Sequence, residues 1–249
     1  MKPRQPAQAT PVPNEKIPQR RHMRLQPFKD VAFDFAIGSL ILVVCIPIML
    51  IVAAAVRLSG PGPVLFRQPR RGLNGRVIMV LKFRTLRADC EDPLCRRQVE
   101  DNDPRVTAIG AVLRHTSLDE LPQLINVLKG DMSLVGPRPH AVGMTVEGRL
   151  NAETVANYTQ RYAVKPGITG LAQVRGSRGR VDTAEQLHQR VCYDLEYINR
   201  RSVLLDLKIL ARTTLQIVTG FRLGSPKPKT QPPQPCPDAT FISAKYDQL

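Results

Sequence analysis

Two adjacent carboxylates, Asp119 and Glu120, are the side chains in this sequence best suited to chemistry, and they lie in the stretch TSLDELPQ. One carboxylate can attack phosphorus as a nucleophile, while a neighbouring carboxylate holds a divalent cation beside phosphate groups. A structural role is the alternative. Pro122 is expected in the first turn of a helix, where Asp119 would cap that helix and Glu120 would favour the positive end of its dipole. Spacing alone leaves this alternative open.

Cationic residues lie close to the pair in the sequence. Arg114 precedes Asp119 by five residues, and Arg138 follows in the stretch SLVGPRP. Guanidinium groups bind phosphate oxygens through paired hydrogen bonds, so both arginines are candidate phosphate ligands. The helix after the pair is indicated by an apolar stripe over residues 121–128, and Gly130 is expected to end it.

The overall charge predicts an anionic partner. The chain of 249 residues has 36 Lys and Arg against 21 Asp and Glu, a formal net charge of +15. Nucleic acid, anionic lipid headgroups and a phosphorylated substrate would each match this charge. Aromatic residues are sparse at 5%, and no nucleic-acid recognition motif is present. We therefore expect a lipid surface and a phosphorylated substrate, and no nucleic acid.

An uncharged segment over residues 35–56 predicts attachment to a membrane. At 1.5 Å per residue, its length matches a hydrocarbon core of about 30 Å. Pro47 lies near its middle and predicts a kink or a break. Basic residues flank the segment on both sides, and positive charge marks the cytoplasmic side of a membrane. The segment could therefore dip into one leaflet and return, or cross as a plain kinked span.

The remaining patterns predict a small mixed domain. The stretch LNG between two apolar runs predicts a β-hairpin. Asp103 and Pro104 are expected to start a short helix. Residues 202–221 predict a helix that lies in the membrane interface or packs on the core.

The predicted fold class is α+β and mostly α-helical. It combines a membrane-dipping N-terminal helix-break-helix with a small cytosolic catalytic domain that has one β-hairpin and interfacial helices. The predicted boundaries are a disordered basic tail at 1–27, a re-entrant helix at 28–58, the catalytic domain at 59–224 and a disordered Pro-rich tail at 225–249.

Four blocks of sequence, in order, carry a resemblance to a known family. They are LSGPGPVLFRQPRRGLNGRVIMVLKFRTL, RHTSLDELPQLINVLKGDMSLVGPRP, VKPGITGLAQVRGSRG and RVCYDLEYINRRSVLLDLKIL. Together they resemble the bacterial sugar transferase family, the monotopic polyprenyl-phosphate hexose-1-phosphate transferases that begin exopolysaccharide, capsule and O-antigen repeat units. The resemblance runs from about Asp34 to Phe221 and looks like a minimal catalytic form of the family.

The resemblance implies a reaction and roles for individual residues. A UDP-sugar would donate hexose-1-phosphate to undecaprenyl phosphate in a Mg²⁺-dependent ping-pong reaction that releases UMP. Asp119 would be the nucleophile that forms an aspartyl phosphosugar, and Glu120 would assist through metal and proton handling, so that both are implied metal ligands. Pro47 would break the re-entrant helix. The positions implied to bind phosphate, metal or substrate are Lys82, Arg114, Arg138, Arg178 and Asp194.

The resemblance also implies a place in the cell and leaves some alternatives open. The enzyme would be an undecaprenyl-phosphate glucose or galactose phosphotransferase of the bacterial inner membrane, with its catalytic domain on the cytoplasmic face and against anionic phospholipid. The alternatives are the same chemistry on an N-acetylated amino-sugar donor, and a non-catalytic membrane scaffold of polysaccharide assembly. Whether the chain forms a homo-oligomer is left open.

Overall fold

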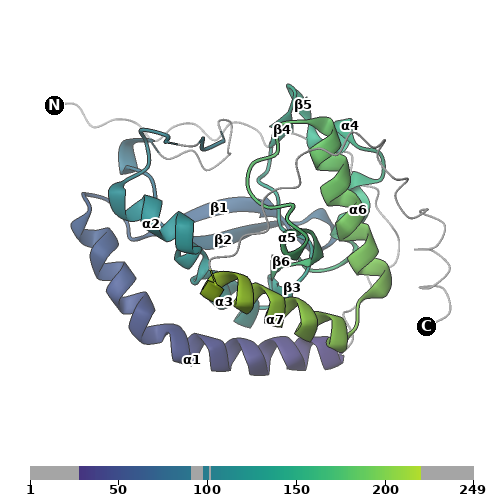
Figure 1. Cartoon of the computed structure of the whole chain (residues 1–249), viewed down its shortest axis with the longest axis horizontal. Helices are drawn as coiled ribbons and strands as arrows, with labels where there is room; N and C mark the ends of the chain where they lie inside the picture. The colour runs from purple at the N-terminus through teal and green to yellow at the C-terminus, as the bar shows by residue number, and fades with distance from the viewer. Residues whose placement is uncertain (1–27, 91–97, 101, 220–249) are drawn as a thin grey trace.

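The computed structural model describes residues 28–90, 98–100 and 102–219. The tails predicted to be disordered, at 1–27 and 225–249, lie outside the described residues. Within the described part, helices predominate and the strands form three separate two-stranded pairings (Figure 1). The mixed, mostly helical class is confirmed, but the expectation of a single β-hairpin is wrong, because two further short pairings are present.

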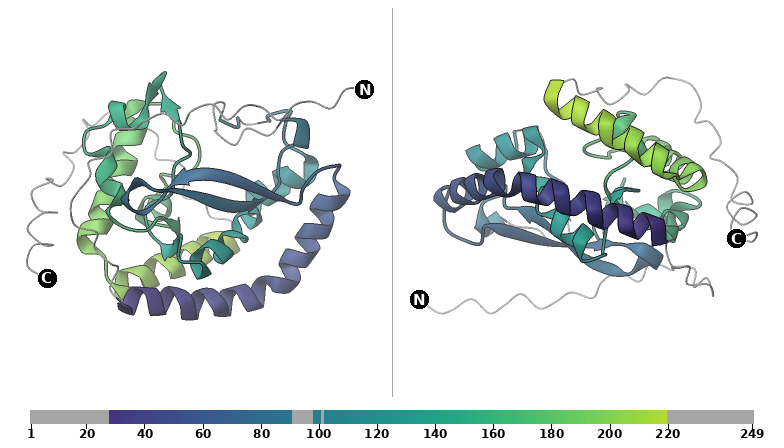
Figure 2. Two further views of the ribbon diagram at one scale, coloured as in Figure 1. Left: turned by 180° about the vertical axis from the view of Figure 1, so that it is seen from behind. Right: turned by 90° about the horizontal axis from the view of Figure 1, so that it is seen from below.

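The N-terminal apolar segment forms one long helix, α1 (Phe28–Leu58). The sequence predicted a kink or a break at Pro47. The helix continues across Pro47, so the predicted helix-break-helix is wrong, and its axis bends part way along its length (Figures 1 and 2). A proline inside a helix removes one backbone hydrogen bond and crowds the preceding turn, and the other hydrogen bonds can hold the helix together around the resulting bend. Its stretch Val31–Leu58 is long and apolar enough to cross a membrane by length and composition.

One side of α1 packs on the rest of the molecule and the other side is exposed. Phe33, Ile37 and Ile41 pack against the main core, and Asp34 accepts hydrogen bonds from the Ser133 hydroxyl at 2.5 Å and from the Leu134 amide at 2.9 Å. On the outer side, large apolar side chains are exposed, among them Val44 at 70%. The rest of the described chain is therefore fixed to a helix with an uncovered apolar face.

The predicted hairpin is confirmed. β1 (Leu65–Arg71) pairs antiparallel with β2 (Val77–Phe83), and the connecting turn (Leu73–Gly75) contains Asn74 and Gly75, both with positive φ. Side chains alternate between the two faces of a strand. The face that carries Lys82 therefore also carries three residues of β1, namely Phe66, Gln68 and Arg70.

Two short helices and a turn carry the candidate carboxylates. Residues Ala108–Thr116 form α2, which Thr107 caps through its side chain, whereas the sequence predicted a start at Asp103. The carboxylate of Asp103 instead forms an ion pair with Arg105, in which Asp103 Oδ2 lies 2.6 Å from Arg105 Nη2. Ser117, with φ 62°, then turns the chain into a 3₁₀ turn (Leu118–Glu120), and α3 (Gln123–Leu128) follows. Asp119 and Glu120 therefore precede α3 without capping it.

A parallel pairing joins two motif segments that are distant in sequence. β3 (Ser133–Val135) pairs with β6 (Gly167–Thr169), close to the start of α5 (Leu171–Val174). A Cβ atom added to Gly167 would lie 2.1 Å from the backbone nitrogen of Gly136, so this approach of two backbones requires glycine. The contact fixes the start of the loop that carries Arg138.

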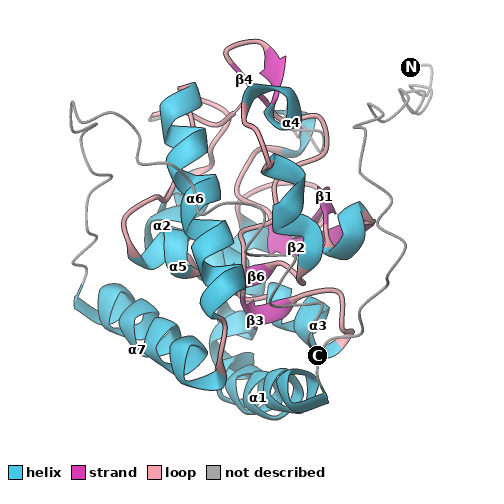
Figure 3. Cartoon of the chain, turned by 90° about the vertical axis from the view of Figure 1, so that its right-hand side faces the viewer, coloured by secondary structure: helices cyan, strands magenta, loops and turns pink. Residues whose placement is uncertain are grey.

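The remaining elements complete the core and the exposed face. β4 (Thr145–Val146) pairs with β5 (Arg149–Leu150), and α4 (Asn151–Thr154) and a 3₁₀ segment (Tyr158–Ala163) follow. The helix α6 (Ala184–Arg200) buries Leu187, Val191 and Leu195 in the main core. The last helix, α7 (Val203–Thr219), buries Ile209 but exposes Leu204, Leu215 and Val218. Figures 1 and 3 place α7 and α1 at the same side of the molecule.

Candidate active site

An open cavity of about 240 Å³ lies against the inner face of the hairpin. Further walls come from the turn after α2, the loop after β3, and α6. Among the described residues that line it, Asp119 is the one with a carboxylate. The cationic lining residues are Arg70, Lys82, Arg84, Arg105, Arg114, Arg138, Arg180 and Arg190. This excess of positive charge suits a ligand with several phosphate groups.

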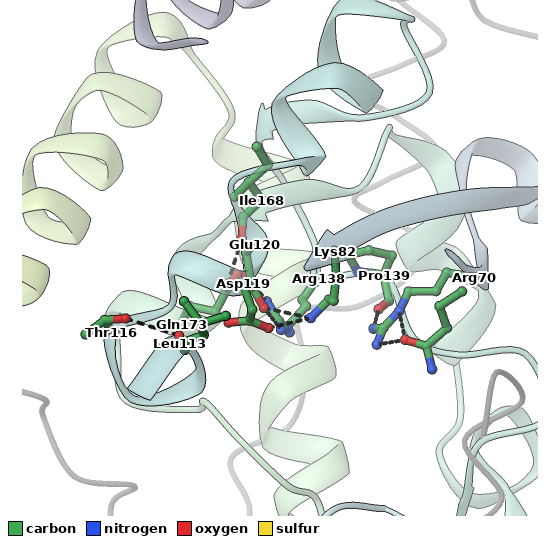
Figure 4. Close-up of polar contacts among 11 residues, drawn as sticks. Arg70, Lys82, Leu113, Thr116, Asp119, Glu120, Arg138, Pro139, Ile168 and Gln173 are labelled. Carbon is green, nitrogen blue, oxygen red and sulfur yellow. Dashed lines mark hydrogen bonds and ion pairs between the residues drawn. The ribbon is translucent and has the colours of Figure 1, made fainter. Parts of the chain in front are cut away.

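Asp119 and Glu120 meet two of these cations at one edge of the cavity (Figure 4). The Lys82 ammonium lies 3.0 Å from Glu120 Oε1 and 3.7 Å from Asp119 Oδ2. Arg138 donates from Nη1 to Glu120 Oε2 at 3.1 Å and from Nη2 to Glu120 Oε1. Glu120 therefore has both oxygens bound by cations, whereas Asp119 lies beside Lys82 at a longer distance.

The two carboxylates have opposite pKa shifts. Burial raises the pKa of Asp119, and the adjacent negative charge of Glu120 raises it further, against the opposing effect of Lys82. Burial alone would also raise the pKa of Glu120, but Arg138 and Lys82 outweigh it and hold that pKa well below its usual range. Glu120 is thus a fixed anion that orients two cations. Asp119 is buried, less tightly paired and directed at the cavity, which are properties of a nucleophile.

The purely structural alternative for the pair does not match this geometry. A helix cap would accept a hydrogen bond from a backbone N–H of the following helix, but α3 begins after Pro122 and has no side-chain cap. Burying two carboxylates costs free energy unless cations compensate. The fold supplies those cations from β2 and from the loop after β3, two distant segments, which is consistent with a binding or catalytic site.

Another arginine of the cavity lining connects the cavity to the apolar helix. Arg84, two residues after Lys82, is buried. Its guanidinium donates to the carbonyls of Val56, Gly60 and Pro61 at the end of α1, at 3.1, 2.8 and 2.5 Å. The strand that carries Lys82 is therefore fixed to the end of the apolar helix, and the site is held at a set distance from that helix.

The structure separates the other predicted site residues into two groups. Arg114 lies on α2 and lines the cavity. Arg178 does not line it; its Nε donates to the carbonyl of Gln173 at 3.1 Å. Asp194 is buried in an ion pair with Arg161, at 2.6 Å, and Arg161 in turn donates to the Arg138 carbonyl at 2.7 Å. Asp194 therefore supports Arg138 from behind, through Arg161.

Several lining residues were not singled out from the sequence. Arg70 is one of them: its Nη2 lies 2.6 Å from the side-chain oxygen of Gln68, and its guanidinium also donates to the carbonyl of Pro139. The two-residue period of the strand could have identified it, because Arg70 shares a face with Lys82. Arg190 and His140 come from α6 and from the loop after β3, and no local pattern indicates that these segments meet at the cavity.

Comparison with known proteins identifies the family of this chain. A model of the bacterial sugar transferase family matches residues 25–220. The exopolysaccharide production protein PSS of Rhizobium leguminosarum bv. phaseoli is 47% identical over 188 residues, which cover 76% of this chain and 94% of that protein. The undecaprenyl-phosphate glucose phosphotransferase of Komagataeibacter xylinus is 50% identical over 73% of this chain and 34% of its own length.

A third relative points the same way. The UDP-glucose:undecaprenyl-phosphate glucose-1-phosphate transferase of Escherichia coli (strain K12) is 49% identical over 74% of this chain. The match covers 39% of that protein, so the chain corresponds to about a third of the two longer relatives and to nearly all of the Rhizobium one. The resemblance seen in the four sequence blocks is confirmed, and with it the predicted enzyme class. The chain belongs to the bacterial sugar transferase family.

Proposed function

We propose that the chain transfers hexose-1-phosphate from a UDP-sugar to undecaprenyl phosphate, and so begins a polysaccharide repeat unit. The names of its relatives support this reaction, with glucose as the first donor to test. The observation that carries the proposal is the placement of Asp119. It is the carboxylate in the described lining of a cavity that is otherwise rich in arginine, beside Lys82. A phosphate-binding cavity with a buried carboxylate is what phosphosugar transfer through a covalent intermediate needs.

In the first step, an oxygen of Asp119 attacks the phosphorus that bears the sugar. The bond from that phosphorus to the bridging oxygen of the diphosphate breaks, and UMP leaves with this oxygen and its electron pair. The product is an aspartyl phosphosugar. Arginines of the cavity, such as Arg70 and Arg114, are positioned to compensate the charge that develops on the departing phosphate.

In the second step, an oxygen of undecaprenyl phosphate attacks the same phosphorus. The acyl phosphate bond breaks, Asp119 is regenerated as a carboxylate, and undecaprenyl diphosphate-sugar is released. Glu120 acts in both steps by holding Lys82 and Arg138 in place. Its low pKa makes it a weak base, so we assign it to positioning and metal binding, not to proton transfer.

Mg²⁺ fits the carboxylate pair only together with the substrate. The described residues contain no group of three or more His, Cys, Asp or Glu side chains that could hold a metal. Mg²⁺ commonly binds one or two carboxylates plus substrate phosphates and water, and Asp119 with Glu120 would provide such carboxylates. When bound, the ion would neutralise charge on the transferred phosphate.

The acceptor is a lipid, so the site must lie near a membrane surface. We propose that α1 is a re-entrant helix whose bend at Pro47 returns the chain to the cytoplasmic face of the inner membrane. Two observations support this: α1 and α7 lie at one side of the molecule (Figure 3), and both helices expose large apolar residues. Anionic phospholipid would add attraction for the basic chain. Cysteines introduced near residues 20 and 60 should then both be shielded from a membrane-impermeant reagent in intact cells.

Release of UMP tests the proposed reaction. Purified protein in vesicles that contain undecaprenyl phosphate is given a panel of UDP-sugars, with UDP-glucose and an N-acetylated donor among them. We expect UMP release with at least one donor and its loss by roughly three orders of magnitude in Asp119→Asn. Glu153 is an exposed carboxylate that does not line the cavity, and Glu153→Gln provides the control. Equal turnover by Asp119→Asn and wild type would refute the role of Asp119, and no release with any donor would favour the scaffold alternative.

A further inference from the structure

A buried histidine lines the catalytic cavity, and one of its ring nitrogens has no hydrogen-bond partner among the described residues. His140 follows Arg138 by two residues on the loop after β3 and is 3% exposed. In the described part of the chain, its Nε2 is buried and makes no hydrogen bond. An unsatisfied buried donor or acceptor is destabilising, so its presence at a substrate cavity indicates a role that the protein without substrate does not show.

The other ring nitrogen is held by a network behind the cavity. Nδ1 lies 2.7 Å from the Tyr158 hydroxyl and 3.3 Å from the amide nitrogen of Asn151. The same hydroxyl is 3.4 Å from the Asn151 amide nitrogen and 3.5 Å from Arg161 Nη1, which are both donors. With donors on its other side, the hydroxyl gives its own proton to Nδ1. Nδ1 is therefore an acceptor, and the ring proton is carried by Nε2.

The ring is also kept neutral. Burial lowers the pKa of His140 well below its usual range, and the positive charges of Arg161, Arg190 and Arg70 lower it further. A neutral ring with its acceptor side occupied can offer one hydrogen bond only, from Nε2–H. The cations of the cavity sit on flexible side chains, whereas the Nε2–H of His140 is a donor with one fixed direction.

We propose that His140 binds the nucleotide donor by hydrogen bonding from Nε2 to a phosphate oxygen of its diphosphate. The inference rests on the proposed function and adds a residue to its substrate site. A phosphate oxygen is the expected acceptor because two arginines line the same cavity as His140. Arg138 contacts Glu120, and Arg70 contacts the carbonyl of Pro139. His140 is thus a binding and positioning residue, and it takes no proton in the reaction.

Two substitutions separate the two ring nitrogens. In His140→Asn, the amide reaches the place of Nδ1 and can keep the bond to Tyr158, but nothing replaces Nε2–H. In His140→Gln, the longer amide can place an N–H donor near the position of Nε2 and loses the bond at Nδ1. The exposed His115→Asn on α2 is the control, since it does not line the cavity.

Binding of UDP by calorimetry and steady-state kinetics with UDP-glucose provide two independent readouts. We expect His140→Asn to weaken UDP binding and raise KM by roughly 10- to 100-fold, with a smaller change in kcat. His140→Gln should recover most of the binding while losing more thermal stability than His140→Asn. His115→Asn should match wild type in all three measurements.

The inference would be overturned if His140→Asn bound UDP as tightly as wild type, or if both variants lost affinity only in proportion to their loss of stability. Unchanged UDP binding with a raised KM for UDP-glucose would also overturn it, because the bond would then go to the sugar. These outcomes are distinct from failure of the proposed function, in which wild type itself would release no UMP from any donor.

Discussion

Removal of the Lys82 charge should destabilise the protein and change its pH dependence together. Lys82→Met keeps a long apolar side chain and deletes the ammonium that lies 3.0 Å from Glu120 and 3.7 Å from Asp119. At an effective dielectric constant of about 20, two unit charges about 4 Å apart interact by about 4 kcal/mol. The loss is partly compensated because Arg138 still pairs with Glu120 and the carboxylates keep some contact with water. We expect the free energy of unfolding to fall by about 2 kcal/mol.

The pH profile of the same variant tests the link between Lys82 and Asp119. Asp119 must be ionised to attack phosphorus, and its pKa is already raised by burial while Lys82 lowers it. Without Lys82 the pKa of Asp119 rises further, so a larger fraction is protonated at any given acidic pH. The acid limb of kcat/KM, along which activity is lost as the pH falls, should therefore move to higher pH.

The assay is UMP release from UDP-glucose in vesicles containing undecaprenyl phosphate, from about pH 5 to about pH 9. Lys82→Arg keeps the charge and should leave the acid limb near that of wild type. Lys129→Met removes a charge from an exposed position and serves as the control for net charge. If the acid limb of Lys82→Met coincided with that of wild type, the reasoning that Lys82 controls ionisation of Asp119 would be refuted.

Three further predictions concern the scaffold and the membrane face. Gly110→Ala should lower the free energy of unfolding by about 1–3 kcal/mol, because its Cβ would lie 2.0 Å from the Thr85 carbonyl oxygen. In Gly38→Ala the nearest contact of the new Cβ is 3.4 Å, so this control should be neutral or stabilising when both variants are compared by thermal melting. Asp194→Asn should lower the free energy of unfolding by about 3–5 kcal/mol, since it leaves the Arg161 charge buried and unpaired. If denaturant titration gave the variant the stability of wild type, the result would argue against this ion pair. Val44→Asp, on the exposed side of α1, should weaken co-sedimentation with vesicles by about 2.5–3.5 kcal/mol, and an equal effect of Val112→Asp on α2 would show that α1 is not the membrane face.

Local sequence signals predicted the elements that have a local cause. The Asn74–Gly75 turn gave the hairpin because few other residue pairs adopt positive φ at both positions, and the apolar segment gave α1 from length and composition. Pro47 predicted a disturbance of α1, but whether a helix bends or breaks at a proline depends on how the rest of the helix packs. Asp103 was misread as a helix start because its carboxylate binds the backbone amide and the guanidinium of Arg105, two residues further on, and Thr107 caps α2 instead.

The site itself was predictable only in part. Asp119, Glu120 and Arg138 were singled out from residue type and spacing and Lys82 through a family resemblance, and the structure brings these four together. Their mutual contacts depend on the pairing of β3 with β6, two strands of three residues each that are too short to show a period. For the same reason no pattern indicated that Asp194 would lie behind Arg138.

The sequence also did not predict how the catalytic domain is connected to the apolar helix. Arg84 lies in the first of the four blocks that carry the family resemblance, and no sequence pattern indicated that it would be buried. It is buried against three carbonyls at the end of α1. Helix ends leave such carbonyls without partners inside the helix, but which side chain satisfies them depends on where a distant strand is placed.

The central claim is that Asp119 carries the phosphosugar between two substrates, and isotope exchange tests it most directly. Wild-type protein is incubated with UDP-sugar and labelled UMP in the absence of undecaprenyl phosphate. Because formation of the aspartyl phosphosugar is reversible and needs no acceptor, label should enter the UDP-sugar pool with wild type and not with Asp119→Asn. A wild-type enzyme that turns over when acceptor lipid is added, but exchanges no label without it, would contradict the covalent route.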